Sequence, residues 1–194
     1  PDRPVCGGSL GTANAQSYCV PNIAWADPAA AREAVRGAGF VWEVSEFHKG
    51  AVSCTGNEFC NLAITETKAR LREIVAHLES EMLWDEPLRI HLNGCPNSCG
   101  QHHVADLGFY GVSRHVDGYT VPHFQVVLGG QWQENAGSYG LATGAVPAKR
   151  IPAVVQGLTG RHLAGPETGR TRRALRQPPG KGGGQRRPDQ ATHS

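Results

Sequence analysis

The clearest periodic pattern of apolar residues lies between residues 64 and 82. Its members recur at helical spacing: Ile64, Leu71, Ile74, Val75, Leu78 and Met82. Apolar residues three and four apart share one face of an α-helix, so this segment is predicted to be an amphipathic helix. Glu66 and Arg70 are expected to pair on its exposed side. Pro87 prevents the helix from continuing further.

Two other segments carry helix signals. In "ADPAAAREAVRGAG", residues 26–39, Asp27 suits the N-cap, Pro28 suits the first helical position and glycines can end the helix. In "VPAKRIPAVVQGL", residues 146–158, Pro147 is expected near the start of a second helix.

The strand candidates are short apolar segments bounded by turn residues. They are Phe40–Val44, Leu88–Leu92, Val104–Val112 and His123–Gly130. Leu88–Leu92 alternates apolar and polar residues, as a half-buried strand does. Asp117 and Gly118 supply a turn between the last two candidates, and glycine-rich loops follow. Helices mixed with hairpin strands in this order predict an α+β domain.

The length and composition suit a globular protein. The chain has 194 residues, of which 39% are hydrophobic, enough for one domain with a tail. No apolar run approaches the roughly 20 residues that a membrane-spanning helix needs. The first ten residues lack the basic and apolar regions of a signal peptide. A cytoplasmic location without a membrane partner is therefore expected.

The net charge of +2 combines two regions of opposite sign. Residues 1–160 hold 11 Lys and Arg and 15 Asp and Glu, a balance of −4, whereas residues 161–194 hold 8 and 2, a balance of +6. The second region is rich in Gly, Pro and Arg and is predicted to be a disordered, solvated tail. It is either a flexible extension or the product of a shifted reading frame. Without interleaved aromatic residues, no nucleic-acid partner is expected.

Six cysteines in a chain without an export signal indicate metal or redox use rather than structural disulfides. Cys6 and Cys19 stand apart and are read as ordinary thiols. The other four form two pairs: Cys54 with Cys60, and Cys95 with Cys99.

The spacing of these pairs bears on which metal they hold. Five residues separate the first pair and three separate the second. Structural zinc sites use pairs with two to four intervening residues, so the first pair is too wide for an ordinary zinc ribbon. A cubane cluster takes one thiolate for each iron and accepts wider loops. The spacing favours a 4Fe-4S cluster, with zinc or unrelated buried thiols as alternatives.

The neighbours of the cysteines suit cluster chemistry. Gly56, Asn57 and the first turn of the following helix are expected to aim backbone N–H groups at the cluster sulfurs. Gly94 and Gly100 permit close approach, and Pro96 fixes the backbone between the second pair.

Three stretches resemble one known family: "SCTGNEFCNLAITETKAR", "RIHLNGCPNSCGQHHVADLGFYG" and "VVLGG". They are similar to the carboxy-terminal part of the sirohaem-dependent nitrite and sulfite reductases, over about residues 12–160. The resemblance implies the carboxy-terminal part of that haemoprotein fold, with mixed helices and antiparallel strands. It divides the chain into the end of a ferredoxin-like segment (1–50), a cluster- and sirohaem-binding domain (51–160) and the basic tail (161–194).

The resemblance also implies the roles of the cysteines. Cys54, Cys60, Cys95 and Cys99 would hold a 4Fe-4S cluster, and Cys99 would bridge to the sirohaem iron as its axial ligand. A shared thiolate couples the two centres through bonds, so that electrons arriving singly at the cluster pass to the haem.

The reaction implied is the six-electron reduction of nitrite to ammonium in nitrate assimilation, with reduced ferredoxin as the donor. The sequence around the cysteines is more similar to that of ferredoxin-dependent nitrite reductases than to that of sulfite reductases. The alternative reaction is the reduction of sulfite to sulfide. Ferredoxins are acidic. They would dock either on a basic patch in an absent half or on Arg70, Arg72 and Arg150.

Polar residues beside the cysteines are candidates for cofactor contact. Thr55 and Asn57 either contact the cofactor or cap the helix, while Asn97 and Gln101 either donate to it or satisfy the loop backbone. For the histidines at 102 and 103, a place on an exposed loop is favoured over bonding a sirohaem carboxylate or relaying protons.

Family members are much longer, and most residues that clamp the anion lie in an earlier half. This chain alone is therefore expected to have little or no six-electron activity. Two functions of other classes remain open: a non-catalytic iron-sulfur module, and a zinc-stabilised nucleic-acid binder that uses the basic tail.

Overall fold

The computed structural model describes residues 11–13, 16–21, 23, 28–131 and 139–164. The predicted cap Asp27, Cys6 and residues 165–194 of the predicted tail lie outside these residues. Residues 161–164, which the sequence assigned to the tail, are helical. The chain opens with a small antiparallel pair, strands β1 (Gly11–Ala13) and β2 (Ser17–Cys19). Helices α1 (Pro28–Gly37) and α2 (Glu46–Lys49) follow. The predicted first helix is therefore confirmed.

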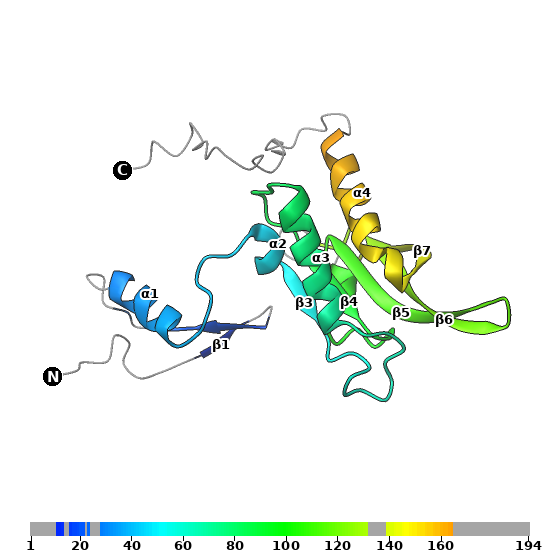
Figure 1. Cartoon of the computed structure of the whole chain (residues 1–194), viewed down its shortest axis with the longest axis horizontal. Helices are drawn as coiled ribbons and strands as arrows, with labels where there is room; N and C mark the ends of the chain where they lie inside the picture. The colour runs from blue at the N-terminus through cyan, green and yellow to red at the C-terminus, as the bar shows by residue number, and fades with distance from the viewer. Residues whose placement is uncertain (1–10, 14–15, 22, 24–27, 132–138, 165–194) are drawn as a thin grey trace.

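A five-stranded sheet forms the centre of the molecule, in the order β3-β4-β5-β6-β7 (Figure 1). Its strands are β3 (Ala51–Ser53), β4 (Ile90–Asn93), β5 (Leu107–Val116), β6 (Tyr119–Leu128) and β7 (Leu141–Pro147). β4 runs parallel to both of its neighbours, whereas β5, β6 and β7 are antiparallel. The α+β class and the antiparallel strands are confirmed, and the parallel half is an addition that the sequence did not indicate.

Two helices cover one face of this sheet: α3 (Lys68–Glu81) and α4 (Ile151–Ala164) (Figure 1). The core between helices and sheet is made by Phe47, Leu71, Ile74, Val75, Leu78, Leu88, Ile90, Leu92, Leu107, Phe109, Phe124, Val126, Ile151 and Val155. Burial of this apolar set is the main force that holds the helices against the sheet.

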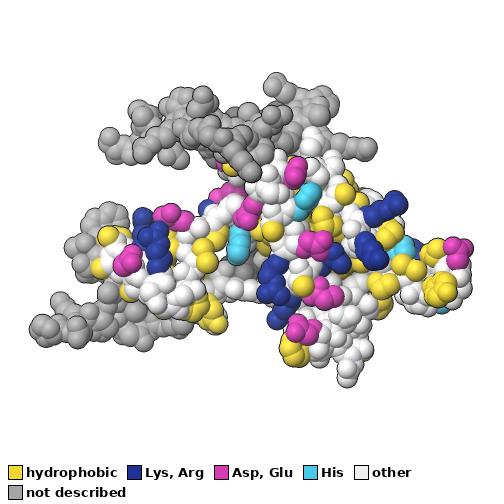
Figure 2. All heavy atoms as spheres, viewed as in Figure 1, with side chains coloured by type: hydrophobic (Ala, Val, Ile, Leu, Met, Phe, Trp, Pro, Cys, Tyr) yellow, Lys and Arg dark blue, Asp and Glu magenta, His cyan; other side chains and the backbone are white. Residues whose placement is uncertain are grey.

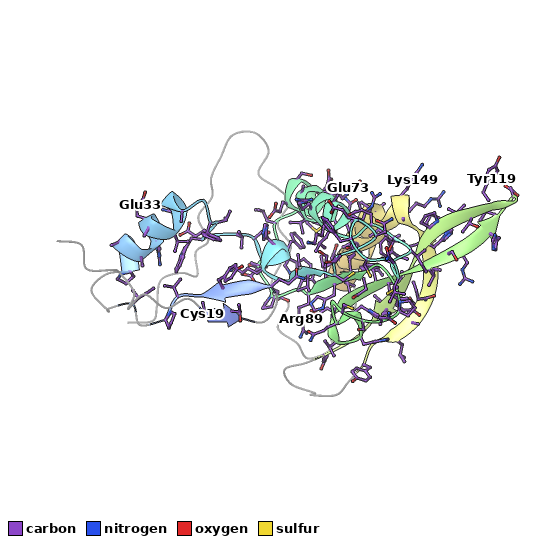
Figure 3. The ribbon with its side chains drawn as sticks, turned by 90° about the horizontal axis from the view of Figure 1, so that it is seen from below. Cys19, Glu33, Glu73, Arg89, Tyr119 and Lys149 are labelled. Atoms are coloured by element: carbon purple, nitrogen blue, oxygen red, sulfur yellow. The ribbon has the colours of Figure 1, made fainter. Side chains whose placement is uncertain are left out.

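β5 and β6 form a long hairpin whose ten residue pairs run from Leu107↔Leu128 to Val116↔Tyr119. Asp117 and Gly118 connect the strands with φ angles of 49° and 81°. Positive φ at both central residues is the type I′ geometry that Asp-Gly favours, so the predicted turn is confirmed. The tip stands clear of the rest of the molecule, with Tyr119 at its end (Figure 3).

The amphipathic helix predicted after the first cysteine pair is confirmed as α3, with Leu71, Ile74 and Leu78 on its buried face. It begins at Lys68, so Ile64 precedes it and remains 38% exposed. The expected pair of Glu66 with Arg70 is wrong. Both Glu66 carboxylate oxygens instead accept backbone N–H bonds from the first helical turn, each at 2.8 Å. The carboxylate therefore caps the helix.

Pro147 lies close to the start of the last helical segment, as predicted, although outside α4 itself. Pro147 is the last residue of β7, and a short 3₁₀ turn, η2 (Ala148–Arg150), separates it from α4. The predicted helix is real, but Pro152 occupies its first turn. The glycine-rich region expected to be loop contributes β7 because β6 offers it an open edge.

Two strand predictions need correction. Phe40–Val44 forms no strand: Phe40, Val41 and Trp42 are 55%, 71% and 40% exposed, and no described strand pairs with them. Leu88–Leu92 does contain a strand, β4, but it is not half-buried, since all four of its residues are buried. Ile90 and Leu92 belong to the core beneath the helices, and His91 between them contacts the Gln101 carbonyl through Nδ1 at 3.1 Å.

Charged side chains are mixed over the surface. On the face drawn in Figure 2, Lys and Arg lie in small groups with Asp and Glu among them. Of the arginines considered for docking, Arg72 and Arg150 are exposed, while Arg70 pairs with Glu73. Within the described residues, no helix combines the length and the hydrophobicity that crossing a membrane requires.

Candidate functional site

The loops that carry the two cysteine pairs begin at the same edge of the parallel half of the sheet. Cys54 directly follows β3, and Cys95 follows β4 by one residue. The carboxyl ends of adjacent parallel strands lie at the same edge, which brings both loops together. The backbone N–H of Cys54 donates to the carbonyl of Leu92 at 3.0 Å, so the β3–β4 pairing extends one residue, as far as the cysteine.

Gly94 joins the two loops. Its N–H donates to Cys54 Sγ at 3.1 Å, and its carbonyl accepts from the N–H groups of Ile64 at 2.7 Å and Thr65 at 3.3 Å. The N–H of Gly56 also donates to Cys54 Sγ, at 3.4 Å. The Cys54 sulfur therefore receives two backbone N–H groups, one from each loop. Hydrogen bonds to sulfur of this kind are among the features that tune iron-sulfur centres.

Close packing at this junction requires glycine. A Cβ at Gly94 would lie 2.6 Å from the Ala63 Cβ, and a Cβ at Gly111 of β5 would lie 2.2 Å from the Gly94 carbonyl oxygen. Such distances are far inside van der Waals contact. The prediction that Gly94 permits close approach is confirmed, and Gly111 is a further contributor that the sequence analysis missed.

Some backbone N–H groups that were expected to face the cluster bind other acceptors. The N–H of Asn57 donates to the Thr65 carbonyl at 3.2 Å, and α3 begins too late for its first turn to follow Cys60 directly. The Asn57 N–H and two N–H groups of the first turn of α3 are therefore not available to a cluster sulfur as expected. The Gly56 N–H does donate to a sulfur of this site, that of Cys54. Thr67 is the N-cap of α3, so Thr55 and Asn57 do not cap it.

The second loop turns tightly around Cys99. Ser98 and Gln101 have φ angles of 59° and 57°, the left-handed region that non-glycine residues seldom occupy. The Gln101 N–H donates to the Ser98 carbonyl at 2.8 Å, and the Gly100 N–H donates to Oδ1 of Asn93. Asn93 is thus a loop-shaping residue that the sequence analysis did not identify.

The candidate residues differ in exposure. Cys54, Cys60 and Cys95 are partly buried, and Cys99 is exposed. The polar candidates are all exposed: Thr55, Asn57, Asn97 and Gln101. Within the described ranges, no three His, Cys, Asp or Glu side chains gather in a way that would hold a single metal ion.

The expectation that His102 lies on an exposed loop is wrong. It lies in the 3₁₀ turn η1 (His102–Val104) and is completely buried, not on an exposed loop. Its ring lies 4.1 Å from that of His103 and 4.7 Å from that of Tyr110, and neither ring nitrogen has a partner among the described residues. Burial, and then the charges that His103 and His91 would carry, lower the pKa of His102 from 6.5 to about 4. His102 is therefore neutral near pH 7.

Comparison with known families decides the relationship. The family model described as "Nitrite and sulphite reductase 4Fe-4S domain" matches residues 47–176, more than half of the chain. The chain belongs to the nitrite and sulphite reductase 4Fe-4S domain family. The match includes both cysteine loops, so the resemblance found in the sequence is confirmed.

Relatives within this family carry the names of both kinds of reductase. The chain is 42% identical over 110 residues to a ferredoxin–nitrite reductase of Synechococcus elongatus, covering 57% of this chain and 22% of the relative. It is 38% identical over 135 residues to sulfite reductase (ferredoxin) 1 of Mycolicibacterium paratuberculosis, covering 66% and 24%. The chain thus spans about a quarter or less of the relatives it matches.

Among solved structures, the chain is similar to the Mycobacterium tuberculosis NirA protein, with a TM-score of 0.72 and 26% identity. The similarity covers 83% of this chain and 31% of NirA. The mixed sheet with helices on one face is therefore consistent with the fold of a nitrite and sulphite reductase family member.

Proposed function

We propose that this chain is the cluster-binding part of a sirohaem-dependent reductase that converts nitrite to ammonium, with residues 51–160 as its functional domain. Cys54, Cys60, Cys95 and Cys99 hold a 4Fe-4S cluster, and Cys99 also ligates the sirohaem iron. The observation that supports this most is the junction at Gly94, whose N–H donates to Cys54 Sγ at 3.1 Å and whose carbonyl ties down the first loop.

The donor set fits the cluster chemically. Thiolates are the usual ligands of iron-sulfur clusters, and hydrogen bonds to sulfur adjust the stability of the reduced state. The chain offers four thiols on two joined loops and backbone N–H groups on one of them. The exposed Cys99 suits the role of a thiolate shared with a second, larger cofactor, because a large ligand needs an accessible sulfur.

The cofactors supply the electron transfer, and the protein supplies position and electrostatics. Here the left-handed residues Ser98 and Gln101 present Cys99 at the surface. The parallel strands beneath hold the two cysteine loops in register. Neutral His102, buried three residues after Cys99, adds no positive charge to the site near pH 7.

Two observations favour nitrite over sulfite: the amino-acid sequence of the cysteine loops, and the relatives named ferredoxin–nitrite reductase. Reduced ferredoxin is the proposed donor, on the same basis. The sulfite reductase among the relatives makes sulfite the competing substrate. Because the chain spans about a quarter or less of these relatives, six-electron turnover is assigned to a longer polypeptide that includes it.

Cluster binding is tested by purifying the chain without oxygen and measuring iron, acid-labile sulfide and absorption. About four irons and four sulfides per chain are expected. Cys54→Ser and Cys95→Ser should each lose most of the iron. Cys19→Ser is the matched control, because Cys19 is exposed on the small β1–β2 sheet and should leave the iron content unchanged (Figure 3).

The nature of the site follows from what is bound. Iron and sulfide together with sirohaem, in cells that make it, support the reductase. Iron and sulfide without sirohaem would instead support a non-catalytic iron-sulfur module. Zinc in place of iron, or iron content that survives serine at all four loop cysteines, would overturn the proposal. Nitrite and sulfite are then compared as oxidants of a longer reduced polypeptide that includes this chain.

A further inference from the structure

Asn93 is an unusual residue for the last position of a buried strand. Its side chain is 1% exposed. Its Oδ1 accepts the N–H of Gly100, while its Nδ2 is buried without a hydrogen-bond partner among the described residues. A buried amide donor left unpaired is destabilising, because it loses its hydrogen bond to water and gains none in return. A group with that penalty points to an acceptor that is not part of the polypeptide.

The orientation of the Asn93 amide is fixed by its neighbour. An amide can be flipped in principle, exchanging oxygen and nitrogen. Here the Gly100 N–H occupies one side of the group, and only an oxygen can accept from it. The NH₂ group must therefore point away from Gly100, and flipping the side chain would bring two donors together.

The sheet register sets Asn93 beside the first cysteine. Ser53 pairs with Leu92 through the bond from the Cys54 N–H to the Leu92 carbonyl, so Cys54 and Asn93 are the next residues along the two segments. Cys54 and Asn93 are thus neighbours across adjacent strands, which lie about 4.8 Å apart. Above them is Gly100, where an added Cβ would lie 3.1 Å from Asn93 Oδ1 and 3.2 Å from the Cys54 N.

We propose that Asn93 is a positioning residue of the metal centre, with one role for each end of its amide. Through Oδ1 it holds the Cys99–Gly100 turn, and through Nδ2 it donates a hydrogen bond to a sulfur of the cluster. This inference rests on the proposed cluster. Sulfide and thiolate sulfurs are the anionic acceptors that the loops would bring to this point. A donor to sulfur stabilises the more negative, reduced cluster and so raises its reduction potential.

Two substitutions separate the two roles. Asn93→Asp keeps an oxygen for the Gly100 N–H but removes the NH₂ donor, whereas Asn93→Ala removes both. Both variants should have a lower cluster potential than the unmodified chain, and Asn93→Ala should also hold less iron. The expected change is about tenfold in the ratio of reduced to oxidised cluster at a fixed potential, which is 59 mV for a one-electron couple.

A matched control accounts for the charge that Asp introduces. Asn61→Asp places the same charge on an exposed residue next to Cys60 without removing a buried donor. Its shift in potential should be smaller than that of Asn93→Asp. The potential is measured on the reconstituted chain by titration with dyes, followed by electron paramagnetic resonance of the reduced cluster. Equal potentials in the unmodified chain and Asn93→Ala would overturn the donor role.

A direct measurement avoids dependence on the variants. The chain is produced with asparagine labelled isotopically at the side-chain nitrogen, and pulsed electron paramagnetic resonance detects coupling of that nitrogen to the reduced cluster. Coupling that disappears in Asn93→Asp supports the inference. Absence of coupling in a chain that holds a full cluster refutes it. A chain that takes up no iron or sulfide at all would instead refute the proposed function.

Discussion

Acidification should destabilise this protein through one buried histidine. His102 is fully buried, and its pKa is lowered to about 4. An unfolded chain titrates the same residue near 6.5. Between these values the unfolded state binds a proton that the folded state does not. The stability associated with neutral His102 is therefore fully present above pH 6.5 and is lost as the pH falls toward 4.

The magnitude follows from the two pKa values. One pKa unit corresponds to 1.36 kcal/mol, so lowering the pH from 7 to 5 should remove about 2 kcal/mol through His102 alone. The groups that face the ring do not reverse this. His91 and His103 would carry positive charges that disfavour a third, and the Tyr110 ring is neutral. Burial lowers the pKa of His91 as well, so it contributes to acid sensitivity with the same sign.

The assay is urea unfolding of the metal-free chain at pH 7, 6 and 5, followed by circular dichroism. His102→Phe keeps a ring against Tyr110, and His102→Gln gives a second replacement in case the larger ring does not fit. Both variants should lose about 2 kcal/mol less than the unmodified chain between pH 7 and pH 5. His48→Gln alters an exposed histidine of α2 and should leave the slope unchanged.

The reasoning about His102 would be refuted by parallel curves. If His102→Phe and His102→Gln lose as much stability as the unmodified chain over this range, the side chain binds its proton equally in both states. An effect of the opposite sign, with the variants more sensitive to acid, would mean that His102 is protonated in the folded state and has an anionic partner.

Three further predictions use thermal unfolding. Gly111→Ala should lower stability by about 1–3 kcal/mol, because its Cβ would lie 2.2 Å from a backbone oxygen of the second cysteine loop; an unchanged melting temperature would mean that the loop moves freely. Arg89 bonds both oxygens of Asp106 at 2.9 and 3.0 Å, so Arg89→Met should destabilise the chain, and adding Asp106→Asn should recover part of the loss. Leu78→Ala empties a fully buried site and should lower stability by about 2–5 kcal/mol; a loss under 1 kcal/mol would place Leu78 outside the core.

Local patterns in the sequence account for part of the fold. The period of Leu71, Ile74 and Leu78 predicts α3, because the helix meets the core along one stripe. The dipeptide Asp117–Gly118 predicts the hairpin, because both residues adopt the positive φ that the turn needs. The four loop cysteines stand out because two thiol pairs at such spacing are typical of metal or redox sites.

The missed features depend on contacts between distant segments. Asn93 follows the buried Leu92, so the sequence predicts that it faces solvent, but it is buried and Gly100 of the second cysteine loop bonds its side chain. From the sequence, His102 is likewise interpreted as a polar loop residue. In the structure η1 packs closely over Gly108, where an added Cβ would lie 2.0 Å from the His102 carbonyl oxygen. Neither the burial of Asn93 and His102 nor the parallel pairing of β4 can be recognised from neighbouring residues in the sequence.

The central place of β4 has a consequence for the order of folding. The β5–β6 hairpin is local in sequence and has a favourable turn, so it can form within microseconds. β4 must then fit between β3 and β5, and both of its partners are parallel, which requires two long crossover segments to close first. The cysteine loops lie at the ends of these late-pairing strands. The proposed cluster would therefore enter a chain that is already nearly native, completing the fold rather than nucleating it.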